Sequence, residues 1–151
     1  MALQAKVTAS SLKKPKISTK KIYTSFDELE PDETSVIIAT REFTYRPENA
    51  IDGSNGTRWV ASSDDKSPCF TLDFGEIKKI GKCEMSFTLP ALGHIWILEK
   101  SLDAKKWEVC AMQNEVVARS PHIADGIGDA RYLKVKIIQG NPGLWEIKVY
   151  E

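Results

Sequence analysis

The feature that most constrains the fold is a series of short segments in which apolar and polar residues alternate. Every second residue is apolar over residues 82–89, and the same pattern recurs at 70–74, 133–137 and 145–150. A period of two residues is typical of a β-strand that buries one face. No segment carries a helical period over three turns. The sequence therefore predicts an all-β domain.

Turn-forming residues separate these predicted strands. Residues 95–98 are apolar on both faces, as expected for a central strand, and the polar stretch 101–106 follows as a turn. No internal repeat is visible. Several short strands with turns between them indicate an antiparallel β-sandwich or barrel.

Size and charge narrow the function classes. A chain of 151 residues is long enough for one domain with a real hydrophobic core. Lys plus Arg and Asp plus Glu both number 21, so the net charge is zero, which argues against a general nucleic-acid binder. No apolar run reaches the roughly 20 residues that cross a bilayer, and no secretion signal is recognisable. The three cysteines form no CxxC pair and exclude a complete disulfide framework.

The first 34 residues differ in character from the rest. They contain a basic stretch at 13–21 and an acidic stretch at 27–33. Adjacent blocks of opposite charge are typical of a solvated linker, although apolar residues within the segment leave docking against a neighbouring domain open. We predict a charged extension or linker over residues 1–34 and a β-sandwich domain over residues 35–151.

One short loop, residues 50–59, concentrates residues that suit a metal ion. Asp52-Gly53 and Asn55-Gly56 are turn dipeptides, and a tight loop of this kind directs carbonyl oxygens inward, towards Asp52 and Thr57. Clustered hard oxygens favour calcium. The alternative interpretation is a surface turn that Trp59 anchors in the core.

Five segments resemble the discoidin family, also called coagulation-factor type C domains. The sequence has Ala-Ile-Asp-Gly followed by Thr-Arg-Trp, then Phe-Thr-Leu-Asp-Phe-Gly, a Ser-x-Asp-x-x-x-Trp hairpin, Ala-Arg-Tyr-Leu, and a closing Trp-Glu-Ile-Lys-Val-Tyr. Ala104 stands where the hairpin of the family usually has Gly. The segments occur in the order of the family, at residues 50–59, 70–75, 99–107, 130–135 and 145–150.

The resemblance implies an antiparallel jelly-roll β-sandwich of the galactose-binding-domain type. It is closest to the family 32 carbohydrate-binding modules, which are often attached to glycoside hydrolases. The fold alone does not identify a ligand, because members of the family bind sugars, lipid headgroups or proteins.

The resemblance also implies a structural calcium ion in the Asp-Gly loop. The final strand would complete the site, so that two acids nearly a hundred positions apart meet around one cation. The alternative places Glu146 on a solvated strand face beside Lys148. The implied ligands are Asn49, Asp52, Ser54, Thr57, Trp145 and Glu146.

Sugar-binding relatives hold their ligand on loops at one end of the sandwich. A sugar presents hydroxyl edges and apolar C–H faces, so recognition needs a polar cluster and an aromatic ring. Alternatives remain for several residues: His94 as an ordinary strand-end histidine, and Phe43 and Tyr45 as cover for the sandwich end. The candidate ligand-binding residues are His94, Phe43, Tyr45, Arg46 and Asn141.

The expected function is a non-catalytic carbohydrate-binding module within a larger secreted or cell-surface protein that degrades glycosides. Its expected partners are a glycan, with a galactose-type sugar as one candidate, and parent enzyme domains in the same chain. The sequence contains none of the common catalytic motifs. The alternative is a discoidin-like domain that binds a protein or packs against a neighbouring domain of its own chain and has no sugar site. Membrane binding is disfavoured because zero net charge gives no attraction to anionic lipids.

Overall fold

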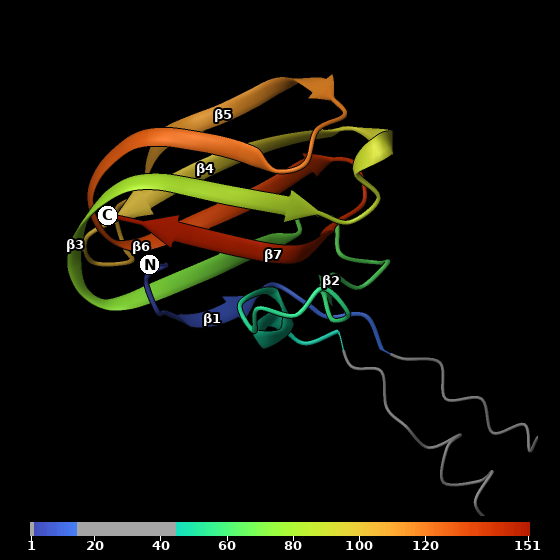
Figure 1. Cartoon of the computed structure of the whole chain (residues 1–151), viewed down its shortest axis with the longest axis horizontal. Helices are drawn as coiled ribbons and strands as arrows, with labels where there is room; N and C mark the ends of the chain where they lie inside the picture. Colours follow the sequence, from blue (N-terminus) through green and yellow to red (C-terminus); the bar gives the residue numbers. More distant parts are fainter. Residues whose placement is uncertain (1, 15–44) are drawn as a thin grey trace, which may run out of the picture. The chain divides into compact units, whose positions relative to one another are not determined.

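The structure is a computed structural model that describes residues 2–14 and 45–151 (Figure 1). Phe43 and residues 15–34 of the predicted extension lie outside the described residues. Two short 3-10 helices are described, η2 (Pro47–Ala50) and η3 (Pro90–Leu92). The strands are β1 (Lys6–Ala9), β2 (Trp59–Val60), β3 (Cys69–Phe87), β4 (His94–Ser101), β5 (Glu108–Val117), β6 (His122–Gln139) and β7 (Gly143–Tyr150).

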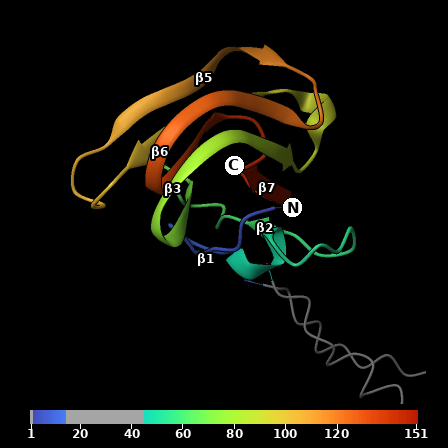
Figure 2. The same ribbon diagram turned by 60° about the vertical axis from the view of Figure 1, so that its left-hand side comes forward.

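Two long strands, β3 and β6, run through both layers of the fold. The first part of β3 pairs with β1 and with the second part of β6, whereas its last part pairs with β7 and with the first part of β6. The second part of β6 also pairs with β4, which pairs with β5 at the edge. Figures 1 and 2 show both long strands turning back on themselves. All pairings are antiparallel, which confirms the predicted β-sandwich.

The bends in these strands occur where their pairing is interrupted. The register between β3 and β6 shifts between Asp73 and Lys78 and again between Ile80 and Lys82. Gly75, with φ +83°, lies in the first interruption, and Gly128, with φ +88°, pairs with Ile80. An interrupted ladder allows a strand to bend sharply, and glycine adopts these backbone angles without strain.

The alternating segments supply the core between the layers. Phe70, Leu72, Cys83, Met85 and Phe87 from β3 are buried, as the pattern predicted. Leu89 is the exception: β3 ends at Phe87, and Leu89 has φ +50° and is 56% exposed. Cys69, Cys83 and Cys110 are free thiols.

β7 contains a bulge at Trp145. Ser86 pairs with Glu146, but the next residue, Phe87, pairs with Leu144, so Trp145 is an extra residue in the strand. Leu144 and Ile147 are buried, whereas Trp145 and Glu146 are only half-buried. The alternation had predicted Trp145 on the same face as Ile147. That prediction is wrong because the bulge breaks the two-residue period.

The first residues of the chain are part of the sandwich. β1 pairs with β3, and the segment after it lies along β2. The Lys13 N–H donates to the Val60 carbonyl at 2.8 Å, and the Trp59 indole donates to the Ser11 carbonyl at 2.8 Å. These residues therefore belong to the folded domain, although the charge pattern had placed them in the extension.

Within the described residues, none of the helices has the length and apolar character that crossing a membrane requires.

Candidate functional site

Asp52 closes the loop that the sequence singled out for a metal. One of its carboxylate oxygens accepts the Ser54 N–H at 2.9 Å, and the other accepts the Thr57 hydroxyl. The Ser54 hydroxyl in turn accepts the Gly56 N–H at 3.1 Å. These are the local hydrogen bonds by which Asp and Ser favour turns.

Glu146 reaches this loop from β7. Its carboxylate accepts a hydrogen bond from the Gly53 N–H, and burial, together with the nearby Asp52 charge, raises its pKa. The structure thus brings the loop and the closing strand together. A carboxylate disfavoured by burial and by a neighbouring acid would gain from a cation. The role of both acids as calcium ligands stays a prediction.

The remaining predicted metal ligands offer backbone and hydroxyl oxygens near these acids. Asn49 is buried in η2, and its side-chain amide donates to the Arg58 carbonyl at 3.1 Å. Across residues 2–14 and 45–151, no group of three or more His, Cys, Asp or Glu side chains is placed to hold a metal. A metal here would need oxygen from the main chain and hydroxyls, a ligand set that calcium accepts readily.

Beside the loop, two cations and two aromatic rings form a row that we call the cation–aromatic ladder: Lys13, Tyr45, Arg58 and Trp145. The Arg58 guanidinium lies 5.2 Å from the centre of the Tyr45 ring and 4.8 Å from the Trp145 ring. The Lys13 ammonium lies 5.7 Å from the Tyr45 ring. Lys13 is exposed and the other three are half-buried, so ligands in solution can reach the ladder.

Sequence reasoning predicted one ladder residue, Tyr45, as a ligand-binding residue. It also predicted the exposed Arg46, which follows Tyr45 in the sequence but is not part of the ladder. Arg58 was missed, although its position next to the buried Trp59 in an extended segment indicates an outward side chain. Lys13 was missed because it was assigned to the extension, and the Trp145 ring because the bulge turns it out of the core.

His94 lies beneath a loop and is not displayed on the surface. Its side chain is 0% exposed and stacks on Phe87, with ring centres 4.5 Å apart. Its Nε2 lies 2.9 Å from the Asn141 carbonyl, and the Asn141 side-chain oxygen accepts the Thr88 hydroxyl. In this structure a glycan therefore has no access to the His94 side chain for the predicted direct contact. Alternation with Trp96 and Leu98 in β4 turns the ring towards the core.

A second histidine, His122, is buried close to the first. The two ring centres lie 6.3 Å apart, and His122 Nδ1 accepts the Trp96 indole N–H at 3.0 Å. Burial lowers the pKa of both His94 and His122. Both rings are therefore neutral parts of the core at neutral pH.

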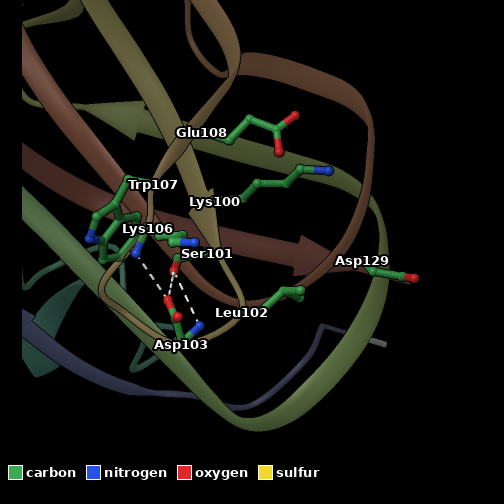
Figure 3. Close-up of a pocket in the computed structure, with 8 residues that line it drawn as sticks. All are labelled: Lys100, Ser101, Leu102, Asp103, Lys106, Trp107, Glu108 and Asp129. Carbon is green, nitrogen blue, oxygen red and sulfur yellow. Dashed lines mark hydrogen bonds between the residues drawn. The ribbon is translucent and has the colours of Figure 1, made fainter.

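A pocket of about 470 Å³ lies at the turn between β4 and β5 (Figure 3). Much of its polar lining has structural partners. Asp103 accepts the N–H groups of Lys105 and Lys106, which lowers its pKa, and the Lys100 ammonium donates to a main-chain carbonyl of β6. Trp107 is half-buried, and the Lys134 ammonium lies 3.9 Å from its ring centre.

The conformation of the same turn shows why the family usually has glycine where this chain has Ala104. Ala104 has φ +65°, a left-handed conformation that glycine adopts easily and alanine does not. The glycine usual at this position thus has a backbone reason. The polar groups of this pocket chiefly maintain the turn.

Comparison with solved structures identifies relatives of the fold. The chain aligns over 99% of its length with part of a glycoside hydrolase, at 30% identity and a TM-score of 0.82, and covers 32% of that protein. It therefore spans about a third of the length of the hydrolase. A comparison with curated proteins finds no match.

Two further structures are carbohydrate-binding modules by name. One is chitosan-binding module 1 from a chitosanase/glucanase of Paenibacillus sp. IK-5, at 18% identity and TM-score 0.68, covering 99% of this chain and 97% of the module. The other is the CBM32 of AlyQ in complex with 4,5-unsaturated mannuronic acid, at 16% identity and TM-score 0.67, covering 100% and 98%. At these identities the similarity establishes the fold.

The family itself follows from the sequence match. The F5/8 type C domain matches residues 33–148, which is most of the chain. The match contains the Asp52 loop, the turn before Trp107 and the β7 bulge, so the features described above lie within it. The chain belongs to the F5/8 type C domain family.

Proposed function

We propose that this domain is a non-catalytic carbohydrate-binding module of a larger, secreted or surface-attached protein that degrades glycosides. The observation that carries the proposal is the alignment of nearly the whole chain with about a third of a glycoside hydrolase. The fold shared with a chitosan-binding module and a mannuronate-bound module supports it.

Such a module acts by raising the local concentration of substrate around its enzyme. Binding to a glycan holds the attached enzyme close to its substrate and raises the effective substrate concentration. Affinity at a single site is expected to be weak, because a surface site buries little of a sugar and offsets little of the entropy lost on binding.

The roles of the described acids and histidines support a binding function over catalysis. His94 and His122 are neutral and buried. Asp52 and Glu146 are brought together, but their oxygens accept hydrogen bonds within a tight turn. A glycosidase needs two carboxyl groups on either side of a cleft that holds the sugar.

We also propose a structural calcium ion at the Asp52 loop. Asp52 and Glu146 would supply charge, while Asn49, Ser54, Thr57 and Trp145 would supply neutral oxygens. The convergence of the two acids supports this ligand set. The ion would neutralise the pair and stabilise the junction between the loop and β7.

The proposed function is tested by glycan-array screening of the full chain, followed by affinity electrophoresis in gels that contain the glycans that bind. The panel includes galactosides, because a galactose-type sugar remains a candidate. We expect retarded migration in at least one glycan gel. Circular dichroism establishes that the chain is folded. A folded chain that binds no glycan would contradict the proposal and favour a protein-binding role.

A further inference from the structure

We infer that the cation–aromatic ladder is a glycan-binding site and that it selects saccharides carrying a negative charge, through the Arg58 guanidinium. The inference rests on the proposed carbohydrate binding and adds its location and ligand class. The ligand chemistry is an oxyanion on a sugar ring, either the carboxylate of a uronic acid or a sulfate ester.

Arg58 is held against two aromatic rings. Its guanidinium lies 5.2 Å from the Tyr45 centre and 4.8 Å from the Trp145 centre. A cation–π contact does not use the N–H groups of a guanidinium as donors, so they stay available for a ligand. A fixed guanidinium edge matches the two oxygens of a carboxylate or sulfate.

The ladder carries positive charge. Across the described parts of the chain, neither Arg58 nor Lys13 forms a salt bridge with a carboxylate. Arg46, next in sequence to Tyr45, is exposed. Asp52 and Glu146, the acids of the adjoining loop, accept hydrogen bonds within that loop, and among the described residues neither pairs with Arg58 or Lys13. Within residues 2–14 and 45–151, the ladder therefore carries two cations that no carboxylate pairs with, although the whole chain is neutral.

Segments that are distant in the sequence are fixed around the ladder. The Lys13 N–H donates to β2 at 2.8 Å, and the Arg58 carbonyl accepts the Asn49 amide at 3.1 Å. Trp145 is the extra residue of the β7 bulge, which turns it out of the core. A site whose backbone is already ordered loses less entropy when a ligand binds.

Together these features predict the order of ligands. An oligosaccharide of uronic acids or a sulfated oligosaccharide would bind more tightly than a neutral galacto-oligosaccharide. Chitotriose, whose amines carry positive charge, would bind weakest at this surface. High salt should weaken anionic ligands selectively, because at about 1 M ionic strength the screening length is only about 3 Å.

The test is isothermal titration calorimetry of the full chain with four probes: an oligouronate, a sulfated galacto-oligosaccharide, a neutral galacto-oligosaccharide and chitotriose. Arg58→Ala removes the guanidinium, and Arg58→Lys keeps the charge without the fork. Lys79→Ala is the matched control, since it removes an exposed cation from the β3 bend. Thermal melts establish that each variant is folded.

We expect Arg58→Ala to weaken binding of the anionic probes by about tenfold or more, as loss of a charged hydrogen-bond pair predicts. Arg58→Lys should recover only part of this loss, because an ammonium lacks the planar fork. Lys79→Ala should change each affinity by less than about twofold, because a distant exposed charge is largely screened. The oligouronate and the sulfated probe separate the two anion sources.

The outcomes separate this inference from the proposed function. Binding of neutral glycans with no preference for the anionic probes, or anion binding that Arg58→Ala leaves unchanged, would overturn the inference and leave the carbohydrate-binding proposal intact. Failure of every glycan on the array and of all four probes would overturn both.

Discussion

Gly140 offers a sharp test of how the loop before β7 is packed. Its φ is +105°, and a Cβ at this position would lie 2.5 Å from the Gly93 carbonyl oxygen and 2.6 Å from a ring carbon of His94. The Gly93 oxygen belongs to the backbone, and the His94 ring is buried and stacked on Phe87, so neither group moves easily. We therefore predict that Gly140→Ala is strongly destabilising.

The magnitude has two parts. A non-glycine residue at positive φ costs about 1 kcal/mol, and forcing a methyl group into a packed site adds about 1–3 kcal/mol. The free energy of unfolding should fall by about 2–4 kcal/mol. For a domain of this size, that corresponds to a melting temperature lower by roughly 6–15 °C.

A matched variant isolates the steric part. Gly126 also has a positive φ, +65°, but a Cβ there meets nothing within 4 Å. Gly126→Ala should cost only the backbone term, about 1 kcal/mol. Urea unfolding followed by tryptophan fluorescence measures both variants. Equal losses for the two would refute the close packing of Gly140 on His94.

Three further predictions concern charge and backbone. Burial lowers the pKa of His94 and His122 in the folded state. The contribution of these neutral histidines to the free energy of unfolding is therefore complete above the pKa of an unfolded histidine, about 6.5, and is lost as the pH falls below it. An NMR titration that gives either histidine a pKa above about 6.5 would contradict this. A chelator should lower the melting temperature, and Asp52→Ala or Glu146→Ala should abolish that response; a melting curve unchanged by chelator would exclude the calcium. Ala104→Gly should raise the free energy of unfolding by about 0.5–1 kcal/mol, whereas a loss would show that φ is not strained there.

The sequence predicted the strands well but not their continuity. The alternation at 70–74 and 82–89 indicated two strands, whereas the structure has one strand, β3, that bends between them. The bend lies where the ladder with β6 is interrupted, and the period of two is lost there. Pairing partners determine such bends, and local sequence does not record them.

The sequence predicted those parts of the candidate site whose residues lie close together in the chain. The turn chemistry around Asp52 follows from Asp-Gly and Asn-Gly dipeptides. The inward position of His94 could also have been predicted from the sequence, because His94 shares a two-residue period with Trp96 and Leu98. Its polarity suggested a ligand contact instead. The position of the Trp145 ring could not be predicted from the sequence, because a bulge is a property of paired strands.

The sharing of β3 and β6 between both layers has a mechanical consequence. Neither layer can detach without tearing hydrogen bonds in the other, because each long strand is covalently continuous through the bend. Unfolding should therefore be all-or-none, with no half-open intermediate. A pulling force on either end of the chain would thus meet the resistance of the whole domain and not of one layer.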